Sequence, residues 1–269
     1  MAGAATAAAL TIAGSDSGGG AGIQADLKAF SARGVYGASA ITAVTAQNTR
    51  AVTAIHPLPP AMIRAQIDAV LSDIAIQAVK IGMLGTAEAT RAVAEALQAF
   101  RGKVVLDPVM IAKSGDALLS EDAVSALVAH LLPRADLLTP NLPEAARLLG
   151  TGEARDAAEA VAQGRGICEL GAKAVLMKGG HAEGANCEDF LVTPGSITVF
   201  SAPRIKTRNT HGTGCTLSSA IAAELAKGKP LEEAVGAAHR WLHGAIVAAD
   251  RLNIGAGHGP VHHFHEVWS

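Results

Sequence analysis

A glycine-rich segment at residues 209–216 (NTHGTGCT) carries the clearest chemical signal in the sequence, because it directly precedes an apolar helical stretch. Glycines let consecutive backbone N–H groups turn toward one concavity, and the start of a helix adds partial positive charge. In phosphoryl transfer, such donors meet the charge that is spread over the equatorial phosphate oxygens. The segment, with Gly212, Thr213 and Gly214 at its centre, therefore predicts an anion cradle; a plain glycine-rich turn is the alternative.

Cys215 is expected in the first turn of the helix that follows this cradle. Helix N-termini favour the thiolate, so the position predicts a lowered thiol pKa. A buried structural cysteine is the alternative. A cysteine hydrolase that pairs Cys215 with His211 is a further hypothesis for the same residues, although no other sequence feature supports an acyl pocket.

The early glycine-rich loop, residues 14–22, also joins a strand-like run to a helical one. It does not match the GxGxxG dinucleotide fingerprint, and no Lys-Ser/Thr pair follows it to make a P-loop. We expect its backbone to approach a substrate closely, with a flexible loop as the alternative. Asp26 lies in the following helix, where a solvated face is the commoner role. Gln47 and Met83 follow strand-like runs and would be ordinary loop or core residues in most proteins.

Charged and amide side chains also follow the later strand-like runs. Asp107 ends one of them, and Asn141 opens a helix whose first turn contains Glu144. Helix capping alone explains Asn141. Glu144 fits either a helix-dipole partner or an outer contact to hydrated Mg²⁺, an ion that commonly takes only one or two carboxylates. Lys178 could reach a phosphate as a point charge, although a surface lysine is the commoner role.

The elements that must position these residues follow a simple alternation. Short apolar runs alternate with segments of helical hydrophobic spacing, which predicts an α/β fold with a largely parallel sheet. The strand-like runs are residues 10–13, 39–44, 78–81, 104–106, 137–139 and 174–177, with an antiparallel pair at 190–192 and 197–200. Helical stripes lie at 23–30, 63–70, 93–100 and 124–131, and further helices are expected at 216–226 and 231–252. Because ligands of open α/β sheets bind beyond the carboxyl ends of the strands, we expect the polar residues to meet at that edge.

Composition narrows the class of protein. The 269-residue chain is 49% hydrophobic and 17% charged, which suits one α/β domain over residues 1–269 with a large core. A formal net charge of −2 supplies no basic field for nucleic acid or an acidic membrane. Three cysteines without CxxC spacing, no secretory signal and no apolar span of about 20 residues favour a cytoplasmic protein. The histidine-rich tail, residues 257–265, lacks clean ligand spacing and is expected to pack rather than to bind metal.

Seven motifs, in order over nearly the whole chain, closely resemble those of the hydroxymethylpyrimidine/phosphomethylpyrimidine kinases of thiamine biosynthesis. They are AGSD at 13–16, GGAGIQADLK at 19–28, AQNT at 46–49, KIGML at 80–84, TPNLPE at 139–144, KGGH at 178–181 and HGTGCT at 211–216. The ordered set is highly specific. It implies a ribokinase-like fold, a three-layer α/β/α sandwich with a mostly parallel central sheet, usually as a homodimer. It also implies ATP- and Mg²⁺-dependent phosphorylation of 4-amino-5-hydroxymethyl-2-methylpyrimidine and then of its monophosphate.

The resemblance also implies the residues of the pyrimidine site. Gln47 matches the family's pyrimidine-amide contact, and Met83 and Val109 match walls of that pocket. Gly14 and Asp26 fall in the substrate loop. The loop has Ser17-Gly18 where many family members have Pro-Ser, a departure that affects only fine substrate affinity.

For the nucleotide, the resemblance places Lys178 and Asp107 near the phosphates and the metal, and Asn141 and Thr213 beside the nucleotide. Glu144 matches the acidic residue of the NxxE motif that is associated with Mg²⁺.

Residues 212–215 match the family's anion hole, with Cys215 where broader sugar and nucleoside kinases usually carry Asp. The resemblance therefore implies that a thiolate takes the proton from the substrate alcohol. Two rivals stand beside this kinase: a Cys-type pyridoxal kinase on the same scaffold, and a noncatalytic regulator that binds a nucleotide or a vitamin precursor.

Overall fold

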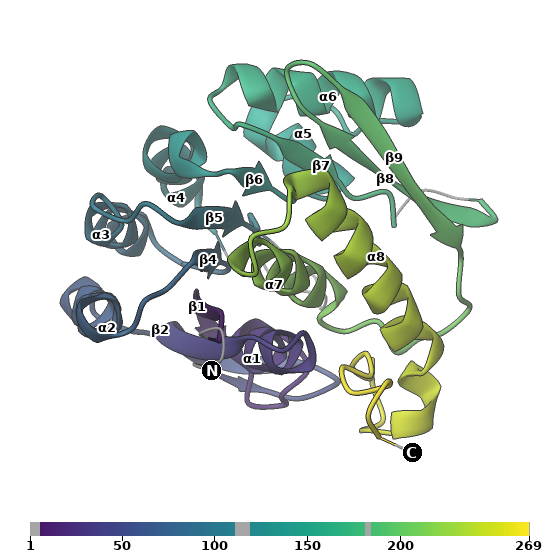
Figure 1. Cartoon of the computed structure of the whole chain (residues 1–269), viewed down its shortest axis with the longest axis horizontal. Helices are drawn as coiled ribbons and strands as arrows, with labels where there is room; N and C mark the ends of the chain where they lie inside the picture. The colour runs from purple at the N-terminus through teal and green to yellow at the C-terminus, as the bar shows by residue number, and fades with distance from the viewer. Residues whose placement is uncertain (1–5, 111–118, 181–183, 269) are drawn as a thin grey trace, which may run out of the picture.

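The computed structural model describes residues 6–110, 119–180 and 184–268. In these residues one nine-stranded sheet has the order β3-β2-β1-β4-β5-β6-β7-β8-β9, with helices packed against it (Figure 1). The strands are β1 (Ala8–Ser15), β2 (Tyr36–Gln47), β3 (Val52–Pro57), β4 (Ala78–Ile81), β5 (Lys103–Leu106), β6 (Leu137–Leu138), β7 (Val175–Met177), β8 (Asn186–Val192) and β9 (Ile197–Pro203). The α-helices are α1 (Gly22–Ala32), α2 (Pro60–Asp73), α3 (Ala87–Ala96), α4 (Glu121–Ala126), α5 (Leu142–Leu149), α6 (Ala157–Glu169), α7 (Thr213–Ala226) and α8 (Leu231–Val247). Short turns of other helix types are η1 (Leu127–Leu131), η2 (Leu132–Arg134) and η3 (Ala249–Leu252).

The centre of the sheet is parallel and both of its edges are antiparallel. Strands β2, β1, β4, β5, β6 and β7 pair in parallel, whereas β3, β8 and β9 run antiparallel to their neighbours. Each parallel neighbour is reached through a crossover that contains a helix, as parallel pairing requires. The predicted α/β fold is therefore confirmed, and the expected antiparallel pair is β8 and β9. The sequence pattern does not predict β3, because its six residues are almost all exposed and show no buried alternation.

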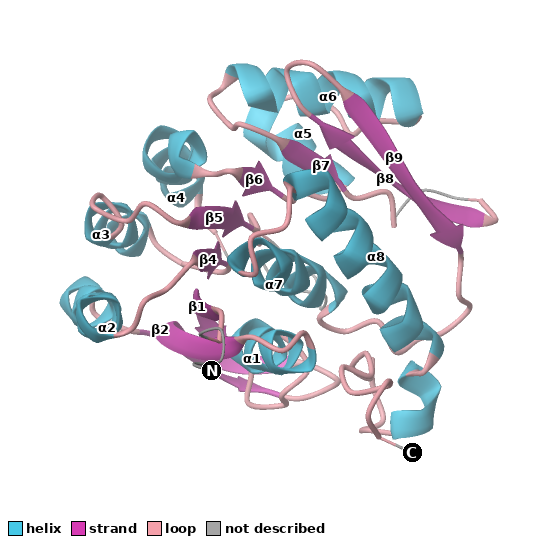
Figure 2. Cartoon of the chain, viewed as in Figure 1, coloured by secondary structure: helices cyan, strands magenta, loops and turns pink. Residues whose placement is uncertain are grey.

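Two hydrophobic cores lie on opposite faces of the sheet, because successive side chains of a strand point to opposite sides. Leu10 and Ile12 of β1 pack with α2 to α6, whereas Ala9 packs with α1, α7 and α8. The strands of the centre are covered on both faces and read as continuous apolar runs for that reason. Figure 2 shows the resulting three layers, with helices on both sides of the strands.

Helix α7 lies against the middle of the sheet, where it contacts β1, β4 and β5 and packs between α1 and α8 (Figure 1). Residues 216–226 are all buried, which fixes the helix firmly on the strands. The helix begins at Thr213, three residues before the expected start. The expected helix 231–252 ends as α8 at Val247 and is followed by the separate turn η3.

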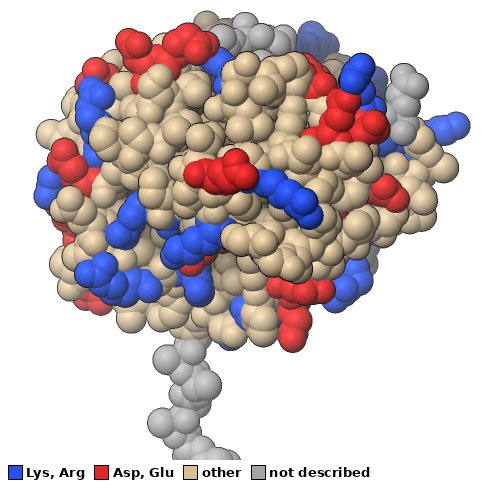
Figure 3. All heavy atoms as spheres, turned by 90° about the horizontal axis from the view of Figure 1, so that it is seen from above, with Lys and Arg blue, Asp and Glu red and all other residues tan. Residues whose placement is uncertain are grey.

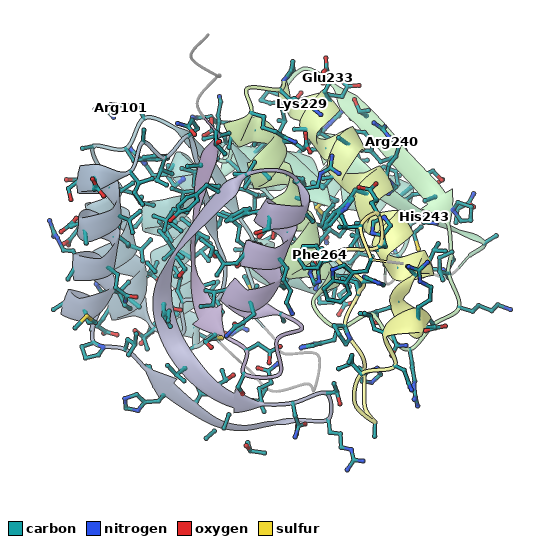
Figure 4. All side chains as sticks on the ribbon, turned by 60° about the horizontal axis from the view of Figure 1, so that its bottom comes forward. Arg101, Lys229, Glu233, Arg240, His243 and Phe264 are labelled. Carbon is teal, nitrogen blue, oxygen red and sulfur yellow. The ribbon has the colours of Figure 1, made fainter. Side chains whose placement is uncertain are left out.

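The C-terminal segment packs between α8 and α1, where Figure 4 shows Phe264. The ring of Phe264 stacks on Trp268, with ring centroids 5.2 Å apart. His263 is only 4% exposed and lies beside Trp241 of α8. The packing role expected for this tail is confirmed.

No helix in the described ranges is both long and apolar enough to cross a membrane. On the face shown in Figure 3, acidic and basic side chains are interspersed among uncharged ones.

Candidate active site

The segment that leads into α7 forms a tight loop directly ahead of the first turn of the helix. Gly212 caps the helix with φ +80°, a conformation that favours glycine, and a Cβ there would overlap the carbonyl oxygen of Gly20. The first N–H to reach back within the helix is that of Thr216, which donates to Gly212 at 2.8 Å. The N–H groups of Gly214 and Cys215 therefore lie ahead of the first intrahelical acceptor and are available to an anion. We call residues 211–215 the anion loop.

The anion loop is joined to the early glycine-rich loop by a pair of side chains. Nε2 of His211 lies 2.8 Å from Oδ2 of Asp16, and Asp16 also accepts the N–H groups of Gly18, Gly20 and Ala21. Burial acts to raise the pKa of Asp16, but the hydrogen bond and charge of His211 and the backbone donors outweigh it, so the pKa is lowered. One ionised carboxylate thus organises both loops.

Four residues predicted for the pyrimidine site lie at the same edge of the sheet. Nε2 of Gln47, at the end of β2, is 3.4 Å from Nε2 of His211. Gly14 of β1 faces the side chain of Met83, whose terminal carbon occupies the place that a Cβ on Gly14 would take. Val109 is partly exposed two residues beyond Asp107, and its N–H donates to the Asp107 carbonyl oxygen at 2.8 Å.

A lysine and two acidic residues meet beyond β5, β6 and β7. Nζ of Lys178 lies 3.1 Å from Oδ1 of Asp107 and 3.9 Å from Oε2 of Glu144. Burial acts to raise the pKa of Asp107, but the positive charges of Lys178 and Lys80 outweigh it and lower the pKa. For Glu144, burial and the negative charge of Asp107 prevail over Lys178 and raise the pKa to about 7.

Asn141 holds Glu144 in place at the start of α5. The side chain of Asn141 accepts the N–H of Glu144 at 2.8 Å, and the carboxylate of Glu144 accepts the N–H of Asn141 at 2.9 Å. This reciprocal capping box confirms the predicted N-cap. It also leaves part of the Glu144 carboxylate facing Lys178.

The anion loop spans the distance between these two groups of side chains. At one end, His211 contacts Asp16 and Gln47. At the other, a Cβ built on Gly214 would lie 3.4 Å from Nζ of Lys178 and 3.7 Å from Oδ2 of Asp107. The structure therefore brings residues predicted for the pyrimidine and for the phosphates to the two ends of one loop.

Two expectations need correction. The predicted lowering of the Cys215 pKa is wrong. The residue is only partly exposed, and burial raises the pKa of its thiol to about 11 against the opposing charge of Lys80. Asp26, expected to bind substrate, lies inside α1 with no exposed side-chain surface, and its carboxylate is bound by Lys80, Thr11 and Ser219. Its partners are protein groups, so this geometry does not support a substrate contact.

Sequence reasoning did not assign Asp16 and Lys80, and it considered His211 only for a hydrolase. A usable signal existed for Asp16, because an Asp before consecutive glycines commonly accepts the N–H groups that follow it. Lys80 is a charged residue inside an otherwise apolar strand, which is itself unusual. His181, the last residue of the KGGH motif at 178–181, lies outside the described residues.

Comparison with known proteins finds relatives over nearly the whole chain. Residues 16–262 match the family model of phosphomethylpyrimidine kinase. A hydroxymethylpyrimidine/phosphomethylpyrimidine kinase of Rhizobium meliloti is 59% identical over 263 residues, which cover 98% of this chain and 99% of that protein. The chain belongs to the phosphomethylpyrimidine kinase family.

Solved structures extend the family relationship to the fold. A phosphomethylpyrimidine kinase from Clostridium difficile is 45% identical, with a TM-score of 0.80 over 90% of this chain and 100% of that one. An ADP complex of Bacillus subtilis pyridoxal kinase is 36% identical, with a TM-score of 0.91 over 98% of this chain and 100% of that one. The expected ribokinase-like α/β/α sandwich is confirmed.

Proposed function

We propose that this chain transfers the terminal phosphoryl group of ATP to the hydroxymethyl group of 4-amino-5-hydroxymethyl-2-methylpyrimidine, and then to the resulting monophosphate, in thiamine biosynthesis. The observation that carries the proposal is the anion loop, which reaches Gln47 at one end and Lys178 with Asp107 at the other. Membership in the phosphomethylpyrimidine kinase family supports the substrate class.

At the acceptor end, the amide of Gln47 offers both a donor and an acceptor to the edge of an aminopyrimidine ring. Met83, packed against Gly14, supplies an apolar surface for the ring. Cys215 stands at the start of α7 with a protonated thiol at neutral pH, since its pKa is raised to about 11. Because the transition state of phosphoryl transfer is loose, the acceptor alcohol can attack before it is deprotonated, and its proton then passes to a phosphate oxygen or to water as ADP leaves.

At the donor end, the N–H groups of Gly214 and Cys215 and the ammonium of Lys178 would meet the transferred phosphoryl group. These donors are fixed before substrate arrives, so they cost little reorganisation when charge moves during the reaction. Thr213, the first residue of α7, lies beside them. Orientation and charge therefore supply most of the proposed rate enhancement.

We further propose that Asp107 and Glu144 hold Mg²⁺, with Asn141 fixing the carboxylate of Glu144. The donor chemistry fits, because two buried carboxylates already converge on one cationic group, Lys178, and hard cations bind oxygen ligands. Among the described residues no cluster of three or more His, Cys, Asp or Glu side chains could hold a metal ion, but Mg²⁺ is commonly bound by one or two carboxylates with phosphates and waters. Bound Mg²⁺ would neutralise charge on the nucleotide phosphates.

Incubation of the purified protein with Mg-ATP and each candidate alcohol, with mass analysis of the products, tests the assignment. The expected result is conversion of the pyrimidine to its monophosphate and then to its diphosphate, with ADP released. The structural likeness to Bacillus subtilis pyridoxal kinase favours pyridoxal as the second candidate substrate. A faster reaction with pyridoxal would support that alternative, and binding without ADP release would support a noncatalytic regulator.

Residues 1–269 are further proposed to form one kinase domain that works as a homodimer in the cytoplasm. The continuous sheet supports one domain, and the three free cysteines suit a reducing compartment. Light scattering coupled to gel filtration measures the subunit number directly.

A further inference from the structure

A buried ion pair lies beneath the anion loop, and neither of its side chains contacts the groups that are proposed to bind substrate. Nζ of Lys80, in β4, is 3.0 Å from each carboxylate oxygen of Asp26, in α1, and neither side chain has any exposed surface. Thr11 and Ser219 each donate a hydroxyl to Asp26 at 2.6 Å. A buried pair of this kind is weak support for stability, since apolar side chains of similar volume often serve as well. Its location is therefore the informative feature.

The pair lies on the side of α7 that carries Cys215. Ser219, which binds Asp26, is four residues after Cys215 and so shares its helical face. Helix α1 begins beside α7, because a Cβ on Gly212 would lie within 3.2 Å of the carbonyl oxygen of Gly20 and of the Cα of Ala21. Asp26 follows four residues after Gly22, the first residue of α1. Asp26 and Ser219 therefore meet about one turn beyond two neighbouring helix starts.

The ammonium of Lys80 is directed toward the carboxyl edge of the sheet. A Cβ built on Gly82 would lie 2.7 Å from Nζ of Lys80, so the side chain runs forward along β4 to the level of residue 82. That level is one residue beyond the end of β4, just as Asp107 and Lys178, which lie beside Gly214 of the anion loop, are one residue beyond β5 and β7. Glycine at position 82 leaves the space that the ammonium occupies.

We propose that Lys80 and Asp26 are positioning residues of the anion loop, an inference that rests on the proposed function. Lys80 supplies a buried positive charge that favours negative charge at Cys215 and on the bound phosphoryl group. Asp26 fixes the ammonium of Lys80 in place. Neither side chain touches substrate. Four charged groups act on the thiol: Lys80 from β4, Lys178 after β7, Asp26 from α1 and Asp107 after β5. Lys80 opposes the effect of burial on the Cys215 pKa, and Asp26 and Asp107 reinforce it.

The test measures the reactivity of one thiol and needs no kinase activity. In a Cys168→Ser, Cys187→Ser background, iodoacetamide can alkylate only Cys215, and the rate at a fixed pH below its pKa is proportional to the thiolate fraction. The variants are Lys80→Met, Asp26→Asn and the two combined, with folding checked by circular dichroism. An added Cys215→Ala change gives the background rate.

The two single substitutions are expected to act in opposite directions. Lys80→Met should slow alkylation by about tenfold or more, and Asp26→Asn should speed it by a similar factor, since a nearby charge shifts a pKa by about one to three units. The double variant should lie between them. A pair that only stabilises the fold would leave the rate unchanged or move both single variants the same way, and either result overturns the proposal.

Three further outcomes also decide the proposal. If Lys80→Met does not fold, because it leaves Asp26 buried without its cation, the Asp26→Asn and double variants still test the sign. Opposite shifts in alkylation with no phosphorylation of any alcohol would support the electrostatic role while rejecting the proposed kinase function. Normal thiol reactivity in both single variants, together with lost kinase activity, would reject the electrostatic role alone.

Discussion

Nε2 of His211 lies 2.8 Å from Oδ2 of Asp16, although the two residues are 195 positions apart in the sequence. The same carboxylate accepts N–H groups from the early glycine-rich loop, so a single side chain sets the distance between that loop and the anion loop. Two segments from opposite ends of the chain thereby form one site.

Asp16→Asn should lower kcat/KM for the pyrimidine by about 100-fold, because a small displacement of positioning groups has effects of that size. The change removes the negative charge that His211 and the backbone N–H groups share. Steady-state kinetics measure the loss. Asp250→Asn is the matched control, since Asp250 also holds a loop through Thr207 and Asn209 but lies at an exposed position. Unchanged kcat/KM in Asp16→Asn would contradict a role for this contact.

Cys215→Ala should lower kcat by about 100-fold or more while the KM for the pyrimidine changes little, since Cys215 lies at the phosphoryl-binding start of α7 and orientation there matters mainly in the transition state. Stopped assays with product quantification measure both constants. Cys187→Ala, at a partly buried thiol in β8, should keep the parent rate. Equal turnover in Cys215→Ala would remove this residue from the catalytic machinery.

Lys178→Met should lower kcat by about 100- to 1000-fold, as expected when a fixed electrostatic donor to the transition state is lost. The negative charges of Asp107 and Glu144 would also lose their shared cation. Lys173→Met serves as the control, because the Lys173 side chain is exposed and its Nζ pairs with Oδ1 of Asp136 at 3.1 Å. Activity at the parent level in Lys178→Met would argue against a phosphate contact.

Two glycines with nearly the same φ angle allow the effect of backbone strain to be distinguished from the effect of steric overlap. Gly212 has φ +80° and Gly228 has φ +84°, but only at Gly212 would a Cβ overlap another group, the carbonyl of Gly20. Gly228→Ala should cost about 1 kcal/mol of unfolding free energy and keep activity. Gly212→Ala should cost more and abolish turnover, because it separates the two loops. Urea denaturation and kinetics test both, and equal effects would show that packing at Gly212 is unimportant.

His263→Gln should change how stability depends on pH. Burial lowers the pKa of His263 from 6.5 to about 3, so between these values the unfolded chain binds a proton that the folded chain does not. The unfolding free energy of the parent therefore falls as pH drops below 6.5, by up to about 1.4 kcal/mol per pH unit from this group. Denaturant unfolding across that range should show a flatter slope for His263→Gln than for the control, exposed His56→Gln. Parallel slopes would mean that His263 is not held neutral.

The central strands could be predicted from sequence because both of their faces are buried. The apolar run 78–81 coincides with β4 for this reason. Helix α6 gives a much weaker signal, since its buried residues are Ala160, Gly164 and Ile167, two of which are small. Exposed β3 likewise lacks the apolar pattern that marks a strand.

Site residues could be predicted where charged side chains directly follow strands, as Asp107 follows β5 and Lys178 follows β7. The contact between Asp16 and His211 was not, because residues so far apart leave no local pattern. The Cys215 pKa was predicted in the wrong direction, since the helix-terminus argument considers the dipole and omits the burial that prevails here.

The anion loop and the first turn of α7 are also hydrogen-bonded to residues 259–263. The N–H of His211 donates to the Gly259 carbonyl at 3.0 Å, and Thr216 is hydrogen-bonded to His263. During synthesis, the anion loop would lack these partners until residues 259–263 leave the ribosome. A nascent chain arrested before residue 259 could assemble its sheet and still leave the anion loop without its shape, so nucleotide binding would follow sheet formation.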